Sequence, residues 1–444
     1  MSHYKPYPAY RDSGVEWIGK VPEHWERRKT AHAFERIGSG TTPPTGQDKW
    51  YSNGDIPWIT TGELRETVIT ETSKYVTTKA LEEFSTLRVY PAGSLAIAMY
   101  GATIGRLGIL GVPATTNQAC CVLSGEISLS IRFAYFWLLA FKQQIIDLYA
   151  VGGGQPNINQ EVIANLRVPA PTIGDQATIT IFLDRETARI DTLIAKKTRF
   201  IELLKEKHSA LITHAVTKGL DPKAKMRDSG VEWIGEVPEH WGVIRLAMVG
   251  ALMKANGGNK QDDAAIGIPC IRYGDIYTTY DLQIHNVKKF INPEAEPNYT
   301  NIQYGDILFA ASGETFEEIG KSAVNLSQAS TCCGGDIIIL RPQLGFNPIF
   351  LAYATGSFSA QAQKSILGKG FTVIHIYGDQ LRNVVIALPP KAEQQLIGNW
   401  IDSESTRIDT IITKTQHSID LLKERRAAFI TAAVTGQIDI RESV

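Results

Sequence analysis

Apolar residues at intervals of seven run through residues 175–216, a stretch without proline or glycine. Two such series, offset by four, form the a/d-type seam of a long helix. One series comprises Leu183, Ile190, Lys197, Leu204 and Leu211, and the other comprises Thr187, Ile194, Ile201, His208 and Ala215. At 1.5 Å per residue, this helix of about 40 residues is roughly 60 Å long. Gly219 and Pro222 are expected to end it.

A second seam lies near the C-terminus. Its two series comprise Ile401, Ile408, Thr415, Leu422 and Phe429, and Ser405, Ile412, Ile419, Arg426 and Ala433. Both seams are interrupted at matching places, Lys197/Thr415 and His208/Arg426. A shared polar interruption could fix the register between two paired helices; partial exposure of these positions is the alternative. Because helices this long need a partner, we expect the two to pair with each other as an antiparallel coiled coil.

The seams belong to a larger internal duplication. The segments 11–25 and 227–241 differ only at Lys20 and Glu236. The repeat spans about half the chain, which is too long for a solenoid and predicts a duplicated domain plus a duplicated helix. A pseudo-two-fold axis follows, and by symmetry the N-terminal copy should pack near the end of the second helix. The fold would then be circular, with the two termini close together.

The residues between the repeated segments differ, apart from scattered landmarks. IPWITTGEL (56–64) corresponds to IPCIRYGDI (268–276), NLRVPAP (165–171) corresponds to NVVIALPP (383–390), and the pair Cys120–Cys121 is matched to Cys332–Cys333. A common frame thus carries two different surfaces, which suits an asymmetric target. Neutral drift after duplication is the alternative.

Composition narrows the possibilities. The 444 residues have a formal net charge of −1, so any basic surface for nucleic acid must be local. We find neither a signal-peptide pattern nor an apolar run long enough to span a membrane, and 134–141 is expected to be a buried helix. The five cysteines lack the spacing of zinc sites and are expected to be small buried thiols in a reducing cytoplasm.

Motifs for catalysis are missing from the sequence. The glycine-rich segments 101–111 and 152–157 lack the Walker lysine and the GxGxxG spacing. The segment Asn347–Phe350 is close to a methyltransferase motif, but we interpret it as a helix start. The chain is therefore expected to be a binding subunit, with no catalytic residue and no metal site.

Layout and motifs together resemble the specificity subunit of type I DNA restriction–modification systems. The resemblance rests on the GVEWIG-x-VPEHW pair, the segment 56–64, and RIDTLI/RIDTII followed by LLKE in the two helices, and it covers essentially the whole chain. It implies an α/β (α+β) fold: two similar mixed α/β target-recognition domains joined by two long helices. The expected boundaries are 1–170 for recognition domain 1, 171–226 for the central helix and linker, 227–389 for recognition domain 2, and 390–444 for the C-terminal helix.

The resemblance also implies function and partners. Each recognition domain would read one half of a bipartite, asymmetric sequence in double-stranded DNA, with the helices setting the gap. Half-sites one helical turn apart, about 34 Å, lie on one face of a duplex. The chain would bind two methyltransferase subunits and, through them, two restriction subunits. It would hold no cofactor itself, whereas S-adenosylmethionine, ATP and Mg are expected on the partners.

Candidate DNA-binding residues are polar loop residues near the landmarks, because side chains that read base edges need paired donors and acceptors. In the first half they are Thr60, Thr61, Arg65, Tyr100, Thr103, Arg106, Gln155 and Asn157, and in the second half Arg272, Tyr273, Ser312, Lys321, Lys369 and Thr372. Arg272 takes the place of Thr60 at a matched landmark, which suits a different base preference. Each of them could instead be a solvated loop residue.

The repeated segments contain Trp17, Trp25, Trp233 and Trp241. These indoles either dock the two methyltransferase subunits or pack against the helix pair, and packing is the favoured interpretation. Two other functions compete with DNA recognition. A complete nuclease or methyltransferase would need the missing motifs, whereas a coiled-coil scaffold for protein partners would show no salt-dependent DNA binding.

Overall fold

The computed structural model describes residues 4–151 and 156–441. Its contacts divide into two compact units, unit 1 (Met1–Lys197 with His417–Val444) and unit 2 (Thr198–Gln416). Each unit contains an α/β domain and a part of both long helices. The boundaries expected from the sequence, at residues 170, 226 and 389, follow the repeats, whereas this division crosses the helices.

Unit 1 is built on a five-stranded sheet with the order β4-β11-β8-β9-β6. All neighbours are antiparallel except β6 and β9. The strands are β4 (Phe34–Ser39), β11 (Cys120–Glu126), β8 (Leu95–Ala98), β9 (Leu107–Leu110) and β6 (Thr67–Ile69). A smaller sheet, β10-β5-β7, comprises β10 (Thr115–Thr116), β5 (Ile56–Ile59) and β7 (Tyr75–Val76).

Both faces of the large sheet are covered at its inner strands, so β8 and β9 are buried at every position. Leu95 and Ile97 of β8 point to one face and pack with helix α3 (Ile131–Tyr149), whose Phe133 and Trp137 are buried. Ala96 and Ala98 point to the other face and pack with Ile59 of β5. The alternation follows from the two-residue period of a strand.

Unit 2 repeats this design. Its sheet order, β16-β26-β22-β24-β19, matches that of unit 1 strand for strand, and β19 and β24 form the parallel pair. The strands are β16 (Gly250–Lys254), β26 (Ile337–Pro342), β22 (Ile307–Ala310), β24 (Ser322–Asn325) and β19 (Gln283–Ile284). The second sheet comprises β17 (Asp263–Ala264), β20 (Phe290–Ile291), β18 (Ile268–Ile271), β25 (Thr331–Cys333) and β21 (Thr300–Ile302).

The helix that covers the sheet differs between the units. In unit 1 it is the single helix α3, whereas in unit 2 it is interrupted at Ser357, which separates α8 (Pro348–Gly356) from α9 (Phe358–Leu367). The side chain of Asn347 caps α8 by accepting a hydrogen bond from the amide of Phe350, which confirms the predicted helix start.

Pairs of short strands complete the fold. At the repeated segments, β1 (Tyr10–Asp12) pairs with β2 (Lys20–Pro22), and β13 (Met226–Asp228) pairs with β14 (Glu236–Pro238). Directly after these segments, β3 (Glu26–Lys29) pairs with β12 (Arg167–Ala170), and β15 (Gly242–Arg245) pairs with β28 (Val385–Leu388). Within unit 2, β23 (Ser312–Gly313) pairs with β27 (Ile374–His375). The remaining α-helices outside the long pair are α1 (Thr30–Ala33), α2 (Thr78–Glu83), α4 (Gln160–Asn165), α6 (Leu246–Val249), α7 (Tyr273–Thr278) and α10 (Gly378–Leu381).

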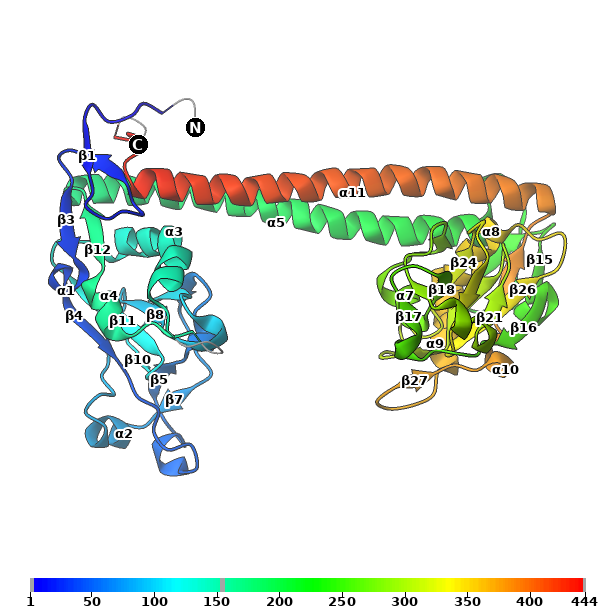
Figure 1. The fold of residues 1–444 in the computed structure, drawn as a ribbon, viewed down its shortest axis with the longest axis horizontal. Helices are drawn as coiled ribbons and strands as arrows, with labels where there is room; N and C mark the ends of the chain where they lie inside the picture. Colours follow the sequence, from blue (N-terminus) through cyan, green and yellow to red (C-terminus); the bar gives the residue numbers. More distant parts are fainter. Residues whose placement is uncertain (1–3, 152–155, 442–444) are drawn as a thin grey trace. The chain divides into compact units, whose positions relative to one another are not determined.

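The two long helices are α5 (Ile173–Lys218) and α11 (Lys391–Val434), and they lie side by side in each unit (Figure 1). In unit 1 the Phe182 and Phe429 rings are 6.2 Å apart, and the Arg426 guanidinium is 2.9 Å from Asp191. Going from Phe182 to Asp191 along α5, the partner on α11 changes from Phe429 to Arg426, so the two helices are antiparallel. In unit 2, His208 Nε2 lies 2.7 Å from Ser405 Oγ. His208 and Arg426 are two of the polar interruptions of the seams. Both are half-buried, and each contacts a residue of the opposite helix.

Helix α5 ends where the sequence predicts. Gly219 follows it with a φ of +75°, a left-handed conformation that favours glycine, and its amide donates to Ala215 O at 3.2 Å. The termini also meet as expected: Tyr10 donates to Gly436 O at 2.9 Å, and Lys5 pairs with Asp439. The circular organisation is thus present within unit 1 (Figure 1).

One predicted landmark is wrong. Cys120 lies on β11 opposite Ala98 of β8, whereas Cys332 lies on β25 opposite Cys270 of β18. The residue of unit 1 that corresponds to Cys332 is Thr115, which pairs with β5. The two Cys-Cys pairs therefore occupy different strands, and their similarity in sequence is a coincidence. All five cysteines are buried free thiols, as predicted, and burial raises the pKa of Cys120 and of Cys121 to about 12.

Candidate nucleic-acid interface

Several strand ends of unit 2 meet at one edge. Strands β18 and β25 are parallel, with Ile271 opposite Cys333, and β22 ends at Ala310 opposite Ile337, where β26 begins. The amide of Gly334 donates to Ile271 O at 3.0 Å, which continues the β18–β25 pairing at this edge. We call the loops there the unit 2 rim: residues 255–261, 272–273, 311–313, 334–336 and 369–378.

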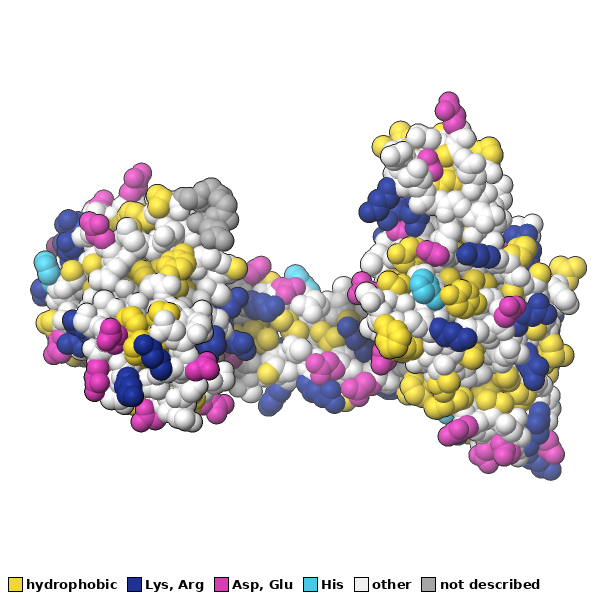
Figure 2. Space-filling model, turned by 90° about the horizontal axis from the view of Figure 1, so that it is seen from below, with side chains coloured by type: hydrophobic (Ala, Val, Ile, Leu, Met, Phe, Trp, Pro, Cys, Tyr) yellow, Lys and Arg dark blue, Asp and Glu magenta, His cyan; other side chains and the backbone are white. Residues whose placement is uncertain are grey.

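A pocket of about 260 Å³ lies in the unit 2 rim. Its polar lining comes from Lys254, Asp336, His375 and Tyr377, and its apolar wall from the adjoining strands. Hydrophobic, basic, acidic and histidine side chains are interspersed on the face of unit 2 shown in Figure 2. This mixture of donors, acceptors and apolar groups is what contact with base edges and phosphates requires.

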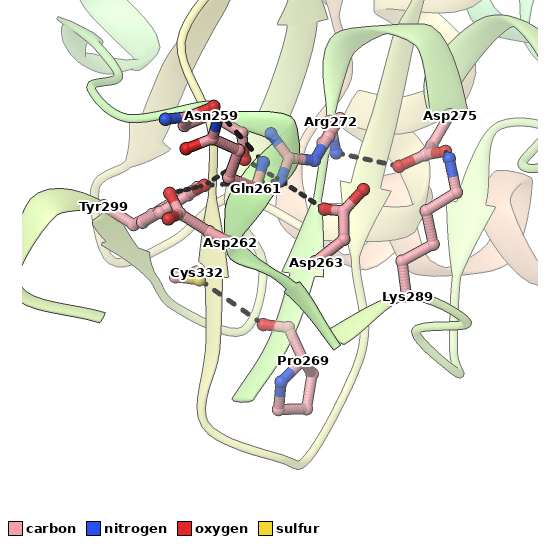
Figure 3. A network of polar contacts seen from close by, with 10 residues as sticks. All are labelled: Asn259, Gln261, Asp262, Asp263, Pro269, Arg272, Asp275, Lys289, Tyr299 and Cys332. Carbon is pink, nitrogen blue, oxygen red and sulfur yellow. Dashed lines mark hydrogen bonds and ion pairs between the residues drawn. The ribbon is translucent and has the colours of Figure 1, made fainter. Parts of the chain in front are cut away.

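Arg272 follows β18 in this rim, and one nitrogen of its guanidinium contacts neighbouring residues (Figure 3). It donates to Asn259 O at 2.9 Å and to Tyr299 Oη at 3.3 Å, and it forms an ion pair with Asp263. Its side chain is only 17% exposed. All of these side-chain contacts are made by one nitrogen, Nη2, and through them Arg272 holds the loop 259–263 in place.

Ser312 also contacts another residue of unit 2. It is buried, and its hydroxyl lies 3.0 Å from His375 Nδ1. Ser312 and His375 are partners in the short pair β23–β27, which supports a hairpin whose exposed residues include Lys369 and Thr372. Ser312 thus positions the hairpin, whereas Lys369 and Thr372 are accessible.

The equivalent edge of unit 1, the unit 1 rim, comprises residues 40–42, 60–61, 100–106, 117–118 and 157. Tyr100 pairs with Asn157 through the backbone, as Ser312 pairs with His375 in unit 2. Burial raises the pKa of Tyr100, so its phenol stays neutral and can donate at neutral pH. The Thr60 hydroxyl is 3.1 Å from Glu63 Oε2, within the cap of a short helix.

The other predicted residues have varied positions. Arg65, Arg106 and Tyr273 are exposed, whereas Thr61, Thr103 and Lys321 are half-buried. The Lys321 ammonium donates to Tyr277 O at 3.3 Å, and the Thr103 hydroxyl donates to Tyr100 O at 3.5 Å. Gln155 lies outside the described residues.

A known family of proteins matches each of the two similar halves of the chain. The model of the type I restriction modification DNA specificity domain matches residues 22–203 and, a second time, residues 238–420. The chain belongs to this family. It therefore carries two target-recognition domains, one in each unit.

Relatives align over the same layout. The type I restriction enzyme MjaIX specificity subunit of Methanocaldococcus jannaschii is 25% identical over 96% of both chains. The EcoKI specificity subunit of Escherichia coli is 22% identical over 72% of this chain and 68% of its own.

Two solved structures share the fold. One, from work on assembly and conformational transition of the type I R-M system, has a TM-score of 0.73 at 15% identity and covers 94% of this chain and 99% of its own. The HsdS subunit from Thermoanaerobacter tengcongensis has a TM-score of 0.54, also at 15% identity, over 94% and 98% of the two chains.

The four tryptophans of the repeated segments divide into two kinds. Trp25 and Trp241 are buried, and the indole of Trp241 donates to Glu393 of α11 at 2.9 Å. These two pack inside the specificity subunit and offer no docking surface. Trp17 is half-buried against Trp137 and Phe141, and Trp233 is 41% exposed.

Sequence reasoning missed several rim residues. The Thr42 hydroxyl donates to Gln118 Oε1 at 2.5 Å, which places an amide between two loops of the unit 1 rim. In unit 2, His375 and Tyr377 stack with ring centroids 6.4 Å apart. The only available signal was their position just beyond short strands, which many other polar residues share.

Residues 4–151 and 156–441 contain no group of three or more His, Cys, Asp or Glu arranged to hold a metal ion. Over the same residues, no helix combines the length and the apolar character needed to cross a bilayer.

Proposed function

We propose that the chain reads a bipartite, asymmetric DNA sequence, with one half-site for each target-recognition domain. The observation that carries this proposal is that the two units share one strand order but have different rims. Tyr100 and Asn157 in unit 1 stand where unit 2 has Ser312 and His375. Different side chains on one frame suit two different half-sites.

We also propose that the helix pair sets the gap between half-sites. Helix α5 is continuous over 46 residues, about 69 Å at 1.5 Å per residue. In unit 1 the half-buried Arg426 forms an ion pair with the exposed Asp191, which adds a specific polar contact to the apolar seam. Such a contact favours one register over its neighbours, which would fix the gap.

In this proposal the chain has no catalytic role and works in the cytoplasm. Two methyltransferase subunits would bring S-adenosylmethionine and methylate adenine, and two restriction subunits would bring ATP and Mg. Identical partners need equivalent surfaces, and the repeated segments 11–25 and 227–241 supply them. Trp17 lines a pocket of about 610 Å³ together with Glu16 and Tyr149, which is accessible to a partner.

Mapping methylated bases in host DNA, with and without the gene, tests the proposal. Loss of methyladenine at one split, asymmetric motif is expected. Binding of the assembled methyltransferase complex to a duplex with that motif should weaken steeply with salt, because phosphate contacts release counterions. An unchanged methylation map together with salt-independent or absent DNA binding would instead favour a protein scaffold.

A further inference from the structure

Phe371 is fully exposed at the tip of the unit 2 rim hairpin. Its neighbours Lys369, Gly370, Thr372 and Val373 are exposed as well. A large aromatic side chain held in water gives up the stabilisation that burial would provide. Its position therefore needs an explanation outside the folding of this chain.

The base of the hairpin is firmly held. Lys369 and His375 exchange two backbone hydrogen bonds of 2.9 and 2.7 Å. Ile374 and Ile376 on either side of His375 are buried in the core of unit 2, and the amide of Ile376 donates to Ala311 O at 2.9 Å. The tip is thus carried on an anchored base and is not a loose loop.

The turn itself depends on glycine. Gly370 has a φ of +134°, and a Cβ there would lie 2.1 Å from Val373 O. No other residue fits this close approach without a backbone shift. This close approach fixes the backbone that carries Phe371.

The surroundings of Phe371 indicate its partner. Lys369 supplies a cation two residues away, and the hairpin belongs to the rim where Tyr377 and His375 are also found. A basic residue beside an apolar wedge is the arrangement used to contact a phosphate and separate stacked bases. We propose that Phe371 is an apolar wedge that enters a base step in the half-site read by unit 2 and bends the duplex there. This rests on the proposed DNA-reading function.

The wedge is specific to one half-site. The backbone pairs Val151 with Asn157 and Lys369 with His375 are equivalent in the two units. The sequence between the first pair begins Gly-Gly-Gly-Gln at residues 152–155, where the second has Gly370, Phe371, Thr372 and Val373. Only the second half-site is therefore expected to be bent in this way, and flexible pyrimidine–purine steps would be preferred there.

The test uses the full chain assembled with its methyltransferase on a duplex that contains the mapped motif. Bending is followed by energy transfer between dyes at the duplex ends, and affinity by anisotropy. Phe371→Ala should weaken binding about tenfold or more and reduce the bend, whereas Phe371→Trp should retain both. Leu344→Ala is the matched control, because Leu344 is equally exposed but follows β26 at the opposite end of the sheet.

The salt dependence separates the roles of neighbouring residues. Phe371→Ala should leave the salt slope unchanged, whereas Lys369→Ala should reduce it by about one phosphate contact. Equal bending and affinity in Phe371→Ala and the unsubstituted complex would overturn the wedge while leaving the DNA-reading function intact. Loss of the methyltransferase from the Phe371→Ala complex would assign Phe371 to a protein contact instead. If even the unsubstituted complex fails to bind the duplex, the proposed function itself is contradicted.

Discussion

Lys364 of α9 is fully buried, and this predicts an unusual dependence of stability on pH. Its ammonium donates to Gly320 O at 2.7 Å and to Thr355 O at 3.0 Å, and lies 5.6 Å from the centre of the Phe309 ring. Burial lowers the pKa of Lys364 to about 7. The perturbation we consider is Lys364→Met, which keeps an unbranched chain but removes the charge.

The direction of the effect follows from which state binds the proton more tightly. In the unfolded chain the pKa of a lysine is about 10.4, so between about pH 10 and 7 the unfolded state binds more protons than the folded one. Lys364 therefore opposes folding increasingly as the pH falls from about 10 to about 7. At 1.36 kcal/mol per pH unit the full penalty is about 5 kcal/mol, of which about 2 kcal/mol develops between pH 9 and pH 7.

The assay is urea unfolding of the full chain at pH 7, 8 and 9, following the transition of unit 2. The unsubstituted chain should gain about 2 kcal/mol relative to Lys364→Met from pH 7 to pH 9. The variant leaves two carbonyls without their donor, a cost of about 1–3 kcal/mol for each, but this cost does not change with pH. Other titrating groups cancel in the comparison. Parallel pH profiles for the two proteins would refute the reasoning.

Two further predictions concern unit 2. Because Arg272 holds the loop 259–263 through Asp263, Arg272→Ala and Asp263→Ala should each impair the reading of several base pairs. The double variant should bind no more weakly than either single variant, which corresponds to a coupling energy of about 1 kcal/mol in a double-mutant cycle of binding. A loss of discrimination at a single base pair in Arg272→Ala alone would instead show direct base contact. Trp241 is buried, so Trp241→Ala should lower the free energy of unfolding by about 3–5 kcal/mol. Trp233 is 41% exposed, so Trp233→Ala should change it by less than about 1 kcal/mol. Equal losses of stability in urea titrations of the two variants would contradict this difference in packing.

Much of the frame could be predicted from sequence because it depends on local and periodic signals. The heptads of α5 and α11, the glycine that ends α5 and the near-identical repeats all mark features that repeat along the chain. Burial of the seam follows the predicted positions: Leu183, Ile190, Ile401 and Ile408 are buried. The circular closure followed from symmetry alone.

The site was harder to predict because it depends on which loops meet at the ends of strands distant in sequence. Arg272 has the type and position of a base reader, yet one nitrogen of its guanidinium contacts Asp263 and Tyr299, which lie 9 and 27 positions away in the sequence. The match between the two Cys-Cys pairs was wrong for a related reason. The pairs look alike in the sequence, but the strand register, which the sequence does not show, places Cys120 and Cys332 on strands that are not equivalent. Phe371 was overlooked because exposure cannot be read from an aromatic residue in a glycine-rich loop.

The most direct test of the central claim is a chimera with two copies of the second reading domain. Residues 26–170 would be replaced by 242–388, because the strand pairs β3–β12 and β15–β28 join the two domains to the frame in the same way. Methylated bases would then be mapped in cells that express the chimera with the methyltransferase. We expect methylation of an interrupted inverted repeat of the second half-site. Methylation that still follows the original asymmetric motif would contradict the assignment of one half-site to each domain.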